Sequence, residues 1–223
     1  WLDHSNERKR HIGSIPLNGG VSMFIGLCFA ITFIFKVDIN YFLILSSFLI
    51  LILGLIDGIS ELTPNTRIFA QLMICLIIFS YGLVQIHSFG DIFGLGVLHF
   101  DRLSLIITVL ALMAGMNSFN LIDGIDGLSS GIAIVAFSAI LYLANRANVI
   151  QIFNLALIYV SILIPFFCIN ISNKKVFMGD SGSLFIGLSI AWLLIESSQG
   201  LNPFIKPVTA LWIFAVPLFD IVT

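Results

Sequence analysis

Residues 41–56 read YFLILSSFLILILGLI, an apolar run without a charged side chain, and Asp57 and Gly58 follow it directly. A helix that crosses a bilayer needs about 20 largely apolar residues. The run and its flanks therefore predict a transmembrane helix that ends at a carboxylate. A carboxylate at the end of a span lies where the bilayer meets water, so it is available for chemistry at the membrane surface.

The composition of the whole chain supports the same interpretation. Hydrophobic residues make up 59% of it, charged residues 10%, and the mean hydropathy is +1.09. A soluble domain carries about 25% charged residues. The net charge of -2 gives no reason to expect a nucleic-acid partner. The three cysteines, Cys28, Cys75 and Cys168, lie in apolar runs, which indicates packing and neither a disulfide framework nor a zinc site.

We therefore predict an all-α fold, a polytopic transmembrane helical bundle. Eight spans are expected, and the short ones imply tilted or re-entrant paths: residues 21–35, 41–56, 68–86, 103–119, 131–143, 149–169, 184–195 and 207–223. The chain begins with Trp1 and ends at Thr223 inside an apolar run. We expect residues 1–223 to form one transmembrane domain that is incomplete at both ends.

Eight crossings sort the loops onto two sides. Residues 1–20, 57–67, 120–130 and 170–183 share one side and contain more Lys and Arg than the loops on the other side. An excess of these cations marks the cytoplasmic side. Most acids fall on this side as well, at helix ends where several could converge on one divalent ion.

A basic segment precedes the first expected span. It contains Arg8, Lys9, Arg10 and His11, and Gly19 and Gly20 follow it. Clustered cations before a glycine pair that opens a helix suit a phosphate group, because glycines let backbone N–H groups approach it. A positive-inside anchor touching anionic lipid explains the cations equally well.

The stretch NSFNLIDGIDGL, residues 117–128, is rich in hard oxygen ligands. Asp123 and Asp126 are three residues apart and either share a helix face or meet in a turn broken by Gly124. Asn120 precedes Asp123 by the same interval. Carboxylate and amide oxygens suit Mg²⁺, which also binds substrate phosphates. A solvated turn between two spans is the alternative, and it leaves two Asn and two Asp unexplained.

Two further stretches place acids at helix ends. Asp180 lies in KKVFMGDSGS, residues 174–183, where Gly and Ser flank an acid at a helix start. This pattern fits a metal or phosphate site, with Phe177 available to stack on a base. It also fits a capped helix in which Asp180 or Ser181 is the N-cap. Asp57 and Glu61 end another span, where spacing alone favours a simple interface turn.

Together these motifs resemble the polyprenyl-phosphate N-acetylhexosamine-1-phosphate transferase family. The similarity extends from residue 8 to residue 220, through RKRHIGSIPLNGG, NSFNLIDGIDGL, KKVFMGDSGSLFIG and TALWIFAVPLFD. The resemblance implies transfer of N-acetylglucosamine 1-phosphate from UDP-N-acetylglucosamine to undecaprenyl phosphate, with release of UMP. This would be the first membrane step of O-antigen or enterobacterial common antigen synthesis, on the cytoplasmic face of a bacterial inner membrane.

Three alternatives stay open. The same chemistry could use another UDP-N-acetylamino sugar, or the chain could be an inactive fragment of such an enzyme. The alternative outside enzymes is a transporter, which would place ionisable residues near the bilayer midplane. The oligomeric state and the downstream polysaccharide are left undetermined.

The resemblance also implies roles for single residues. Asp180 would be the principal Mg²⁺ ligand and Asn120 the second, with Mn²⁺ as the alternative ion. Asp57, Asp123 and Asp180 would be the catalytic acids, and Asp123 would also help to position the nucleotide. The implied substrate-binding residues are Asp126, Gly124 and Phe177 for the nucleotide, and Arg8, Lys9, Arg10 and His11 for phosphate.

The chain departs from the family pattern at its aspartate-rich motif. The family has two adjacent Asp there, and this chain has Asp57 followed by Gly58, with Glu61 where a third acid often stands. The family's first span and its cytosolic His-rich motif are not found in the sequence, and ten to eleven spans are expected of the full protein.

Overall fold

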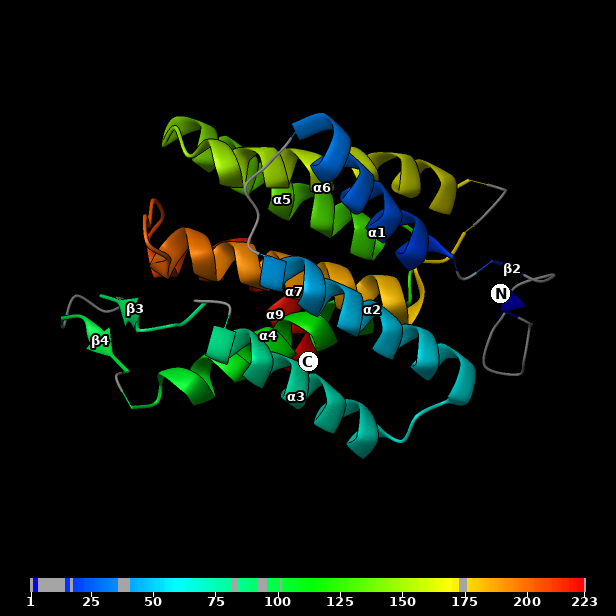
Figure 1. The fold of residues 1–223 in the computed structure, drawn as a ribbon, viewed down its shortest axis with the longest axis horizontal. Helices are drawn as coiled ribbons and strands as arrows, with labels where there is room; N and C mark the ends of the chain where they lie inside the picture. Colours follow the sequence, from blue (N-terminus) through cyan, green and yellow to red (C-terminus); the bar gives the residue numbers. More distant parts are fainter. Residues whose placement is uncertain are drawn as a thin grey trace.

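The computed structural model describes residues 2–3, 15–16, 18–35, 41–81, 84–91, 96–100, 102–172 and 176–222. Within these ranges the chain is predominantly helical. Two short antiparallel pairings accompany the helices: β1 (Leu2–Asp3) with β2 (Ile15–Pro16), and β3 (Ser88–Gly90) with β4 (Leu98–His99). The second pairing forms a small hairpin between two helices (Figure 1).

Each segment that the sequence predicts as a span contains a helix, although the helix of the third segment ends at Tyr81, before the predicted end at residue 86. Five of these helices, in the described residues, are long and apolar enough to cross a membrane: α2 (Tyr41–Ser60), α4 (Ser104–Ile122), α5 (Leu128–Arg146), α6 (Ile150–Asn170) and α7 (Gly179–Gln199). The all-α, polytopic membrane fold is thus confirmed, whereas the structure does not bear out eight full spans.

The remaining predicted spans are short, polar at one end or broken. α1 (Gly19–Phe29) continues as a π-helix, η1 (Ala30–Phe35), and forms a shorter apolar helix with it. α3 (Pro64–Tyr81) begins with a polar turn. The last predicted span divides into α8 (Pro207–Ile213) and α9 (Ala215–Val222). Pro217 accounts for this break, because it has no N–H to donate to the carbonyl of Ile213, the last residue of α8.

α7 forms the centre of the bundle. Its membrane-spanning window is 94% buried, and α1, α2, α4 and α5 all pack against it. Small residues make this possible, since they let helix backbones approach closely. At the crossing with α4, a Cβ added to Gly187 would lie 2.3 Å from the carbonyl oxygen of Gly115. Either glycine replaced by a larger residue would force α4 and α7 apart.

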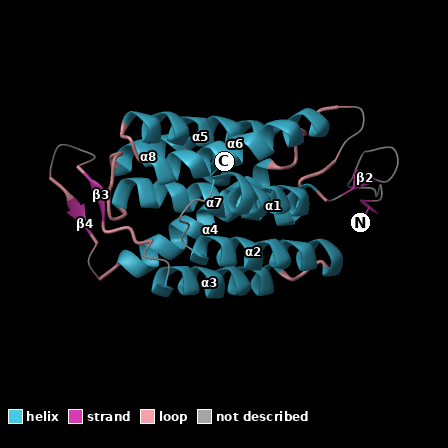
Figure 2. Cartoon of the chain, turned by 45° about the horizontal axis from the view of Figure 1, so that its top comes forward, coloured by secondary structure: helices cyan, strands magenta, loops and turns pink. Residues whose placement is uncertain are grey.

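The other helices form layers on either side of α7. α5 and α6 pack together on one side, and α2 and α3 pack together on the other (Figure 2). Large apolar side chains face outward, among them Val135 of α5, which is 70% exposed, and Tyr142. In water such a surface would be unstable, and in a bilayer it faces the lipid. The chain is a multi-pass helical membrane protein.

The bundle has two distinct ends (Figure 1). The α2–α3 loop, the α4–α5 turn and the start of α7 lie together at one end, and the β3–β4 hairpin lies at the other. We call the first the acidic end, because Asp57, Asp123, Asp126 and Asp180 belong to its loops and helix ends. The predicted sorting of these loops onto one side of the membrane agrees with this arrangement.

Candidate functional site

Asn120 and Asp180 meet at the acidic end. Asn120 lies in the last turn of α4, and Asp180 lies in the first turn of α7. The Asn120 Nδ2 atom donates a hydrogen bond of 2.7 Å to Oδ1 of Asp180 and one of 3.1 Å to Oγ of Ser183. Both residues are half-buried. The structure therefore brings together the two residues that the sequence predicts as metal ligands.

The start of α7 leaves the Asp180 carboxylate available for this contact. The N-cap residue of the helix is Met178, and no side chain caps it. The alternative in which Asp180 or Ser181 serves as the N-cap is therefore wrong. Gly179 has a φ of +68°, a left-handed conformation that glycine adopts without steric strain. This glycine lets the chain turn sharply into the helix at the residue before Asp180.

The end of α4 presents two more acids. The helix stops at Ile122, Asp123 follows as its C-cap, and Asp126 lies in an exposed turn with Gly124. Gly127 closes the turn with a φ of +78°, and a Cβ at this position would lie 2.6 Å from Ile171. The carboxylates therefore meet in a glycine-broken turn and do not share a helix face.

Acidic side chains crowd together at this turn. The pKa of Asp123 is raised from 3.8 to about 8, mainly by burial and also by the nearby carboxylates of Asp180 and Asp126. A hydrogen bond with Ser129 opposes the shift. Like charges held close together disfavour ionisation, and a divalent cation between them would reverse the effect.

Asn170 joins the two loops that carry the predicted nucleotide residues. It lies at the end of α6 and is buried. Its Oδ1 accepts a 2.6 Å hydrogen bond from the N–H of Gly127, and its Nδ2 donates a 2.9 Å hydrogen bond to the carbonyl of Val176. These contacts fix the positions of the residues next to Asp126 and Phe177. Asn170 is not among the residues that the sequence motifs predict, although an Asn at the end of an apolar run is a signal for it.

The glycine pair that opens α1 has a different role from the predicted one. The N–H groups of Gly19 and Gly20 donate to the carbonyls of Phe177 and Met178, both at 3.2 Å. They are therefore not aimed at a phosphate, and this part of the prediction is wrong. A Cβ at Gly20 would lie 2.5 Å from the backbone nitrogen of Gly182. The glycines instead allow α1 to pack against the chain that leads into α7.

Asp57 takes part in a separate interaction at the same end. It is 7% exposed, its Oδ1 accepts a 3.0 Å hydrogen bond from the N–H of Leu62, and its Oδ2 lies 3.4 Å from Nη1 of Arg67. α2 lies directly against the start of α7, because a Cβ at Gly54 would lie 2.4 Å from Cα of Ser181. Asp57 thus lies one helical turn beyond the contact between α2 and α7.

The residues at this end fit Mg²⁺ when substrate completes the coordination. Within the described ranges, no group of three or more His, Cys, Asp or Glu could hold a metal ion. Mg²⁺ is ordinarily held by one or two carboxylates, with water and substrate phosphates filling the other positions. The carboxylate of Asp180, the amide of Asn120 and the crowded charge around Asp123 supply that kind of partial set.

The predicted basic segment, Arg8, Lys9, Arg10 and His11, lies outside the described residues. Phe177 is described and is half-buried, and its carbonyl accepts the hydrogen bond from Gly19. α1 therefore begins beside the loop that carries Phe177, at the acidic end.

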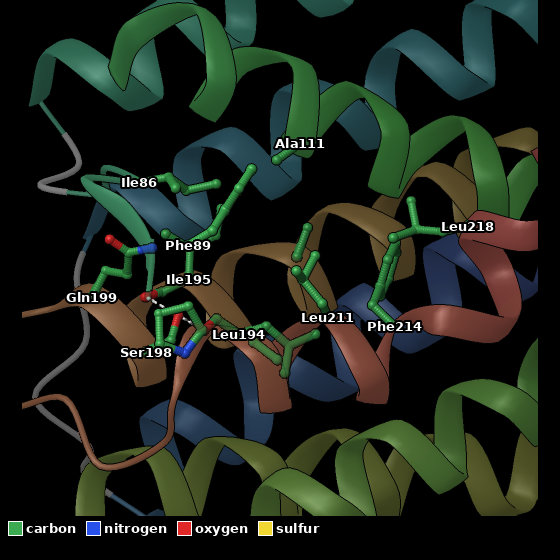
Figure 3. A pocket seen from close by; sticks show the side chains of 13 residues that line it. Ile86, Phe89, Ala111, Leu194, Ile195, Ser198, Gln199, Leu211, Phe214 and Leu218 are labelled. Carbon is green, nitrogen blue, oxygen red and sulfur yellow. Dashed lines mark hydrogen bonds between the residues drawn. The ribbon is translucent and has the colours of Figure 1, made fainter. Parts of the chain in front are cut away.

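An apolar pocket lies away from these residues, between α4, α7, α8 and α9 (Figure 3). Its lining includes Ala111, Leu194, Leu211 and Leu218. None of the predicted site residues contributes to this lining. The candidate chemistry therefore belongs to the acidic end and not to this pocket.

The fold and the candidate site together define a multi-pass membrane protein with acidic and amide side chains gathered at one end of its helical bundle. Residues 39–198 match the family "Glycosyl transferase family 4", and the chain belongs to this family. The family predicted from the motifs is thereby confirmed, and the transporter alternative is set aside.

Three relatives illustrate the similarity, each an undecaprenyl-phosphate alpha-N-acetylglucosaminyl 1-phosphate transferase. The chain is 34% identical over 226 residues to that of Yersinia pestis and 35% identical over 230 residues to that of Escherichia coli K12. It is 37% identical over 227 residues to that of Haemophilus influenzae. The alignments cover 99% of this chain and 62%, 62% and 64% of these relatives.

Proposed function

We propose that the protein transfers N-acetylglucosamine 1-phosphate from UDP-N-acetylglucosamine to undecaprenyl phosphate and releases UMP. The hydrogen-bonded pair of Asn120 and Asp180, at one end of a membrane bundle of this family, carries the proposal. One substrate is water-soluble and the other is a lipid, so a site at the end of a bundle is where they can meet. The names of the relatives specify the same lipid and sugar.

In the proposed reaction a lipid phosphate oxygen bonds to the β-phosphorus of the UDP-sugar. The bond between that phosphorus and the bridging oxygen breaks, and UMP leaves. Phosphoryl transfer depends mainly on positioning and on charge neutralisation. Asp180 and Asn120 would hold Mg²⁺, with Mn²⁺ as the alternative, and the ion would neutralise phosphate charge. Asp57 and Asp123 complete the proposed catalytic set.

The nucleotide would lie against the loops that Asn170 holds together. Phe177 would stack on the uracil, while Asp126 and Gly124 would contact the nucleotide from the facing turn. Stacking on an aromatic ring is worth about 1–3 kcal/mol for each base. Arg8, Lys9, Arg10 and His11 would bind phosphate.

We place the acidic end on the cytoplasmic face of a bacterial inner membrane, because UDP-sugars are cytoplasmic and basic residues gather in the loops of that end. The proposed role is the first membrane step of O-antigen or enterobacterial common antigen synthesis. Ten to eleven spans are proposed for the full protein. The same site could use another UDP-N-acetylamino sugar, since no described contact distinguishes between these sugars.

The test uses membranes that contain the protein expressed from its complete gene, with undecaprenyl phosphate and a panel of radiolabelled UDP-sugars. We expect label in the lipid fraction, UMP in the aqueous fraction and the highest rate with UDP-N-acetylglucosamine. A higher rate with another UDP-sugar would show that the protein prefers that sugar to N-acetylglucosamine. No labelled lipid with any UDP-sugar would refute the proposed reaction.

A further inference from the structure

Gln71 is a polar residue in the middle of an apolar contact. The buried residues of α3 are Gln71, Ile74, Cys75 and Ile78, which form one stripe along the helix. Gln71 is 0% exposed. An amide buried in a helix interface is costly unless it is hydrogen-bonded, so its partner indicates what this residue does.

The partner is Asn117 of α4. The Asn117 Nδ2 atom donates a 2.8 Å hydrogen bond to Oε1 of Gln71, and Nε2 of Gln71 lies 3.4 Å from Oδ1 of Asn117. The Asn117 Nδ2 atom also donates to the carbonyl of Met113 at 2.8 Å. The two amides form a reciprocal pair that joins α3 to α4 inside the bundle.

This pair fixes the rotation of α4 just before the candidate site. Asn117 lies three residues before Asn120, so their side chains differ by about 60° around the helix axis at 3.6 residues per turn. One amide therefore faces α3, and the other faces Asp180 of α7. Side chains lie about 5 Å from the axis, so a rotation of about 15° would move the Asn120 amide by about 1.3 Å.

Two kinds of contact hold α4 next to the candidate site, its packing against α7 and its amide pair with α3. Gly115 and Gly187 set the distance between α4 and α7, because a Cβ at Gly187 would lie 2.3 Å from the Gly115 carbonyl. Apolar side chains such as Met116 and Phe119 are buried beside this contact, and their packing has no directional hydrogen bond. The amide pair supplies the directional contact, because hydrogen bonds weaken steeply as they bend.

We propose that Gln71 is a positioning residue that sets the orientation of Asn120 toward Asp180 through its amide pair with Asn117. This inference rests on the proposed function. Gln71 is fully buried between α3 and α4, so it would act by holding the last turn of α4. A displacement of about 1 Å at a reacting centre can cost about 100-fold in rate, so the loss of this pair should impair transfer.

The test compares three variants of the protein expressed from its complete gene. Gln71→Leu removes the amide, and Gln71→Asn combined with Asn117→Gln exchanges the two amides and keeps their pairing. Gln199→Leu makes the same substitution at the other end of the bundle, where the Gln199 side chain bonds the backbone of His87 and Ser88. Each is measured for transfer rate, for the Mg²⁺ concentration that gives half the maximal rate, and for the rise in Tm that Mg²⁺ produces.

We expect Gln71→Leu to lower the rate at least tenfold, to raise the half-maximal Mg²⁺ concentration and to reduce the Mg²⁺-dependent rise in Tm. The exchanged pair should restore most of the transfer rate, of the Mg²⁺ affinity and of the Mg²⁺-dependent rise in Tm. Gln199→Leu should leave the Mg²⁺ response unchanged. A Gln71→Leu protein with the wild-type Mg²⁺ response, or an exchanged pair as impaired as Gln71→Leu, would overturn the inference. The Tm measurement needs no turnover, so it tests Gln71 even where an inactive wild type refutes the proposed reaction.

Discussion

Asn120 donates a 2.7 Å hydrogen bond to Asp180, although the two residues are 60 positions apart in the chain. The bond joins the last turn of α4 to the first turn of α7, the most buried helix of the bundle. Both ends of the bond are built on helices that pack through glycine, so the pair is held by a rigid scaffold. This arrangement leads to five predictions.

The first prediction concerns Asp126, which lies in the exposed turn after α4. Asp126→Asn removes a charged acceptor proposed to bind the nucleotide, and a hydrogen bond to a charged group is worth about 1.5–3 kcal/mol. We expect the KM for the UDP-sugar to rise about tenfold or more, with little change in the Mg²⁺ requirement. Asp91→Asn, at the hairpin end, is the matched control. An unchanged KM would contradict the nucleotide role.

The second prediction concerns topology. Single cysteines at Ser60, Ile125 and Ser172, in a protein whose three native cysteines are replaced, should be shielded from an impermeant thiol reagent in intact cells. All three positions belong to loops or helix ends of the acidic end. Leu201, which is 91% exposed at the opposite end, is the control and should be labelled. Labelling of any of the first three from outside would refute a cytoplasmic site.

The third prediction concerns pH. The pKa of Asp123 is about 8 in the folded protein against an ordinary 3.8. The folded state therefore keeps a proton that the unfolded state loses, and the free energy of unfolding falls as pH rises between these values. In EDTA, the Tm of the wild type should fall from about pH 5 to about pH 8, and Asp123→Asn should flatten this slope. Equal slopes for the two proteins would contradict the raised pKa of Asp123.

The fourth prediction concerns Gly58, where the family has a second acid. A Cβ at Gly58 would meet nothing within 4 Å, so an aspartate fits there without displacing a neighbour. Asp57 is already paired with Arg67, and a second carboxylate would add charge at the acidic end. We expect Gly58→Asp to raise the transfer rate at least tenfold, which corresponds to about 1.4 kcal/mol in the barrier.

Gly58→Asn is the control for that substitution, since it adds a side chain of similar size without the charge. Rates should be compared at equal protein level, because either change also removes a flexible glycine from the end of α2. Equal rates for the Gly58, Asp and Asn forms would show that the second acid is dispensable in this protein.

The sequence predicts the class of fold and most of the acidic end because apolar runs and glycine-flanked acids are local signals. It could not place Asn170 or Gln71, whose roles depend on hydrogen bonds to residues distant in the chain, Gly127 and Asn117. Hydropathy alone also joined residues 207–223 into one span, although Pro217 predicts a break. Gly19 and Gly20 match a phosphate-binding pattern, because a local motif does not show that their N–H groups bond to Phe177 and Met178.

The most direct test of the account is the release of UMP by the wild type and by Asp180→Asn, with and without Mg²⁺, at equal expression. Asn keeps the size of Asp but lacks the charge that a hard cation requires. We expect Mg²⁺-dependent release from the wild type and a loss of at least 100-fold in the variant, equivalent to about 2.7 kcal/mol or more. Near-normal turnover by Asp180→Asn would contradict the central claim that the Asn120–Asp180 pair forms the metal-dependent site.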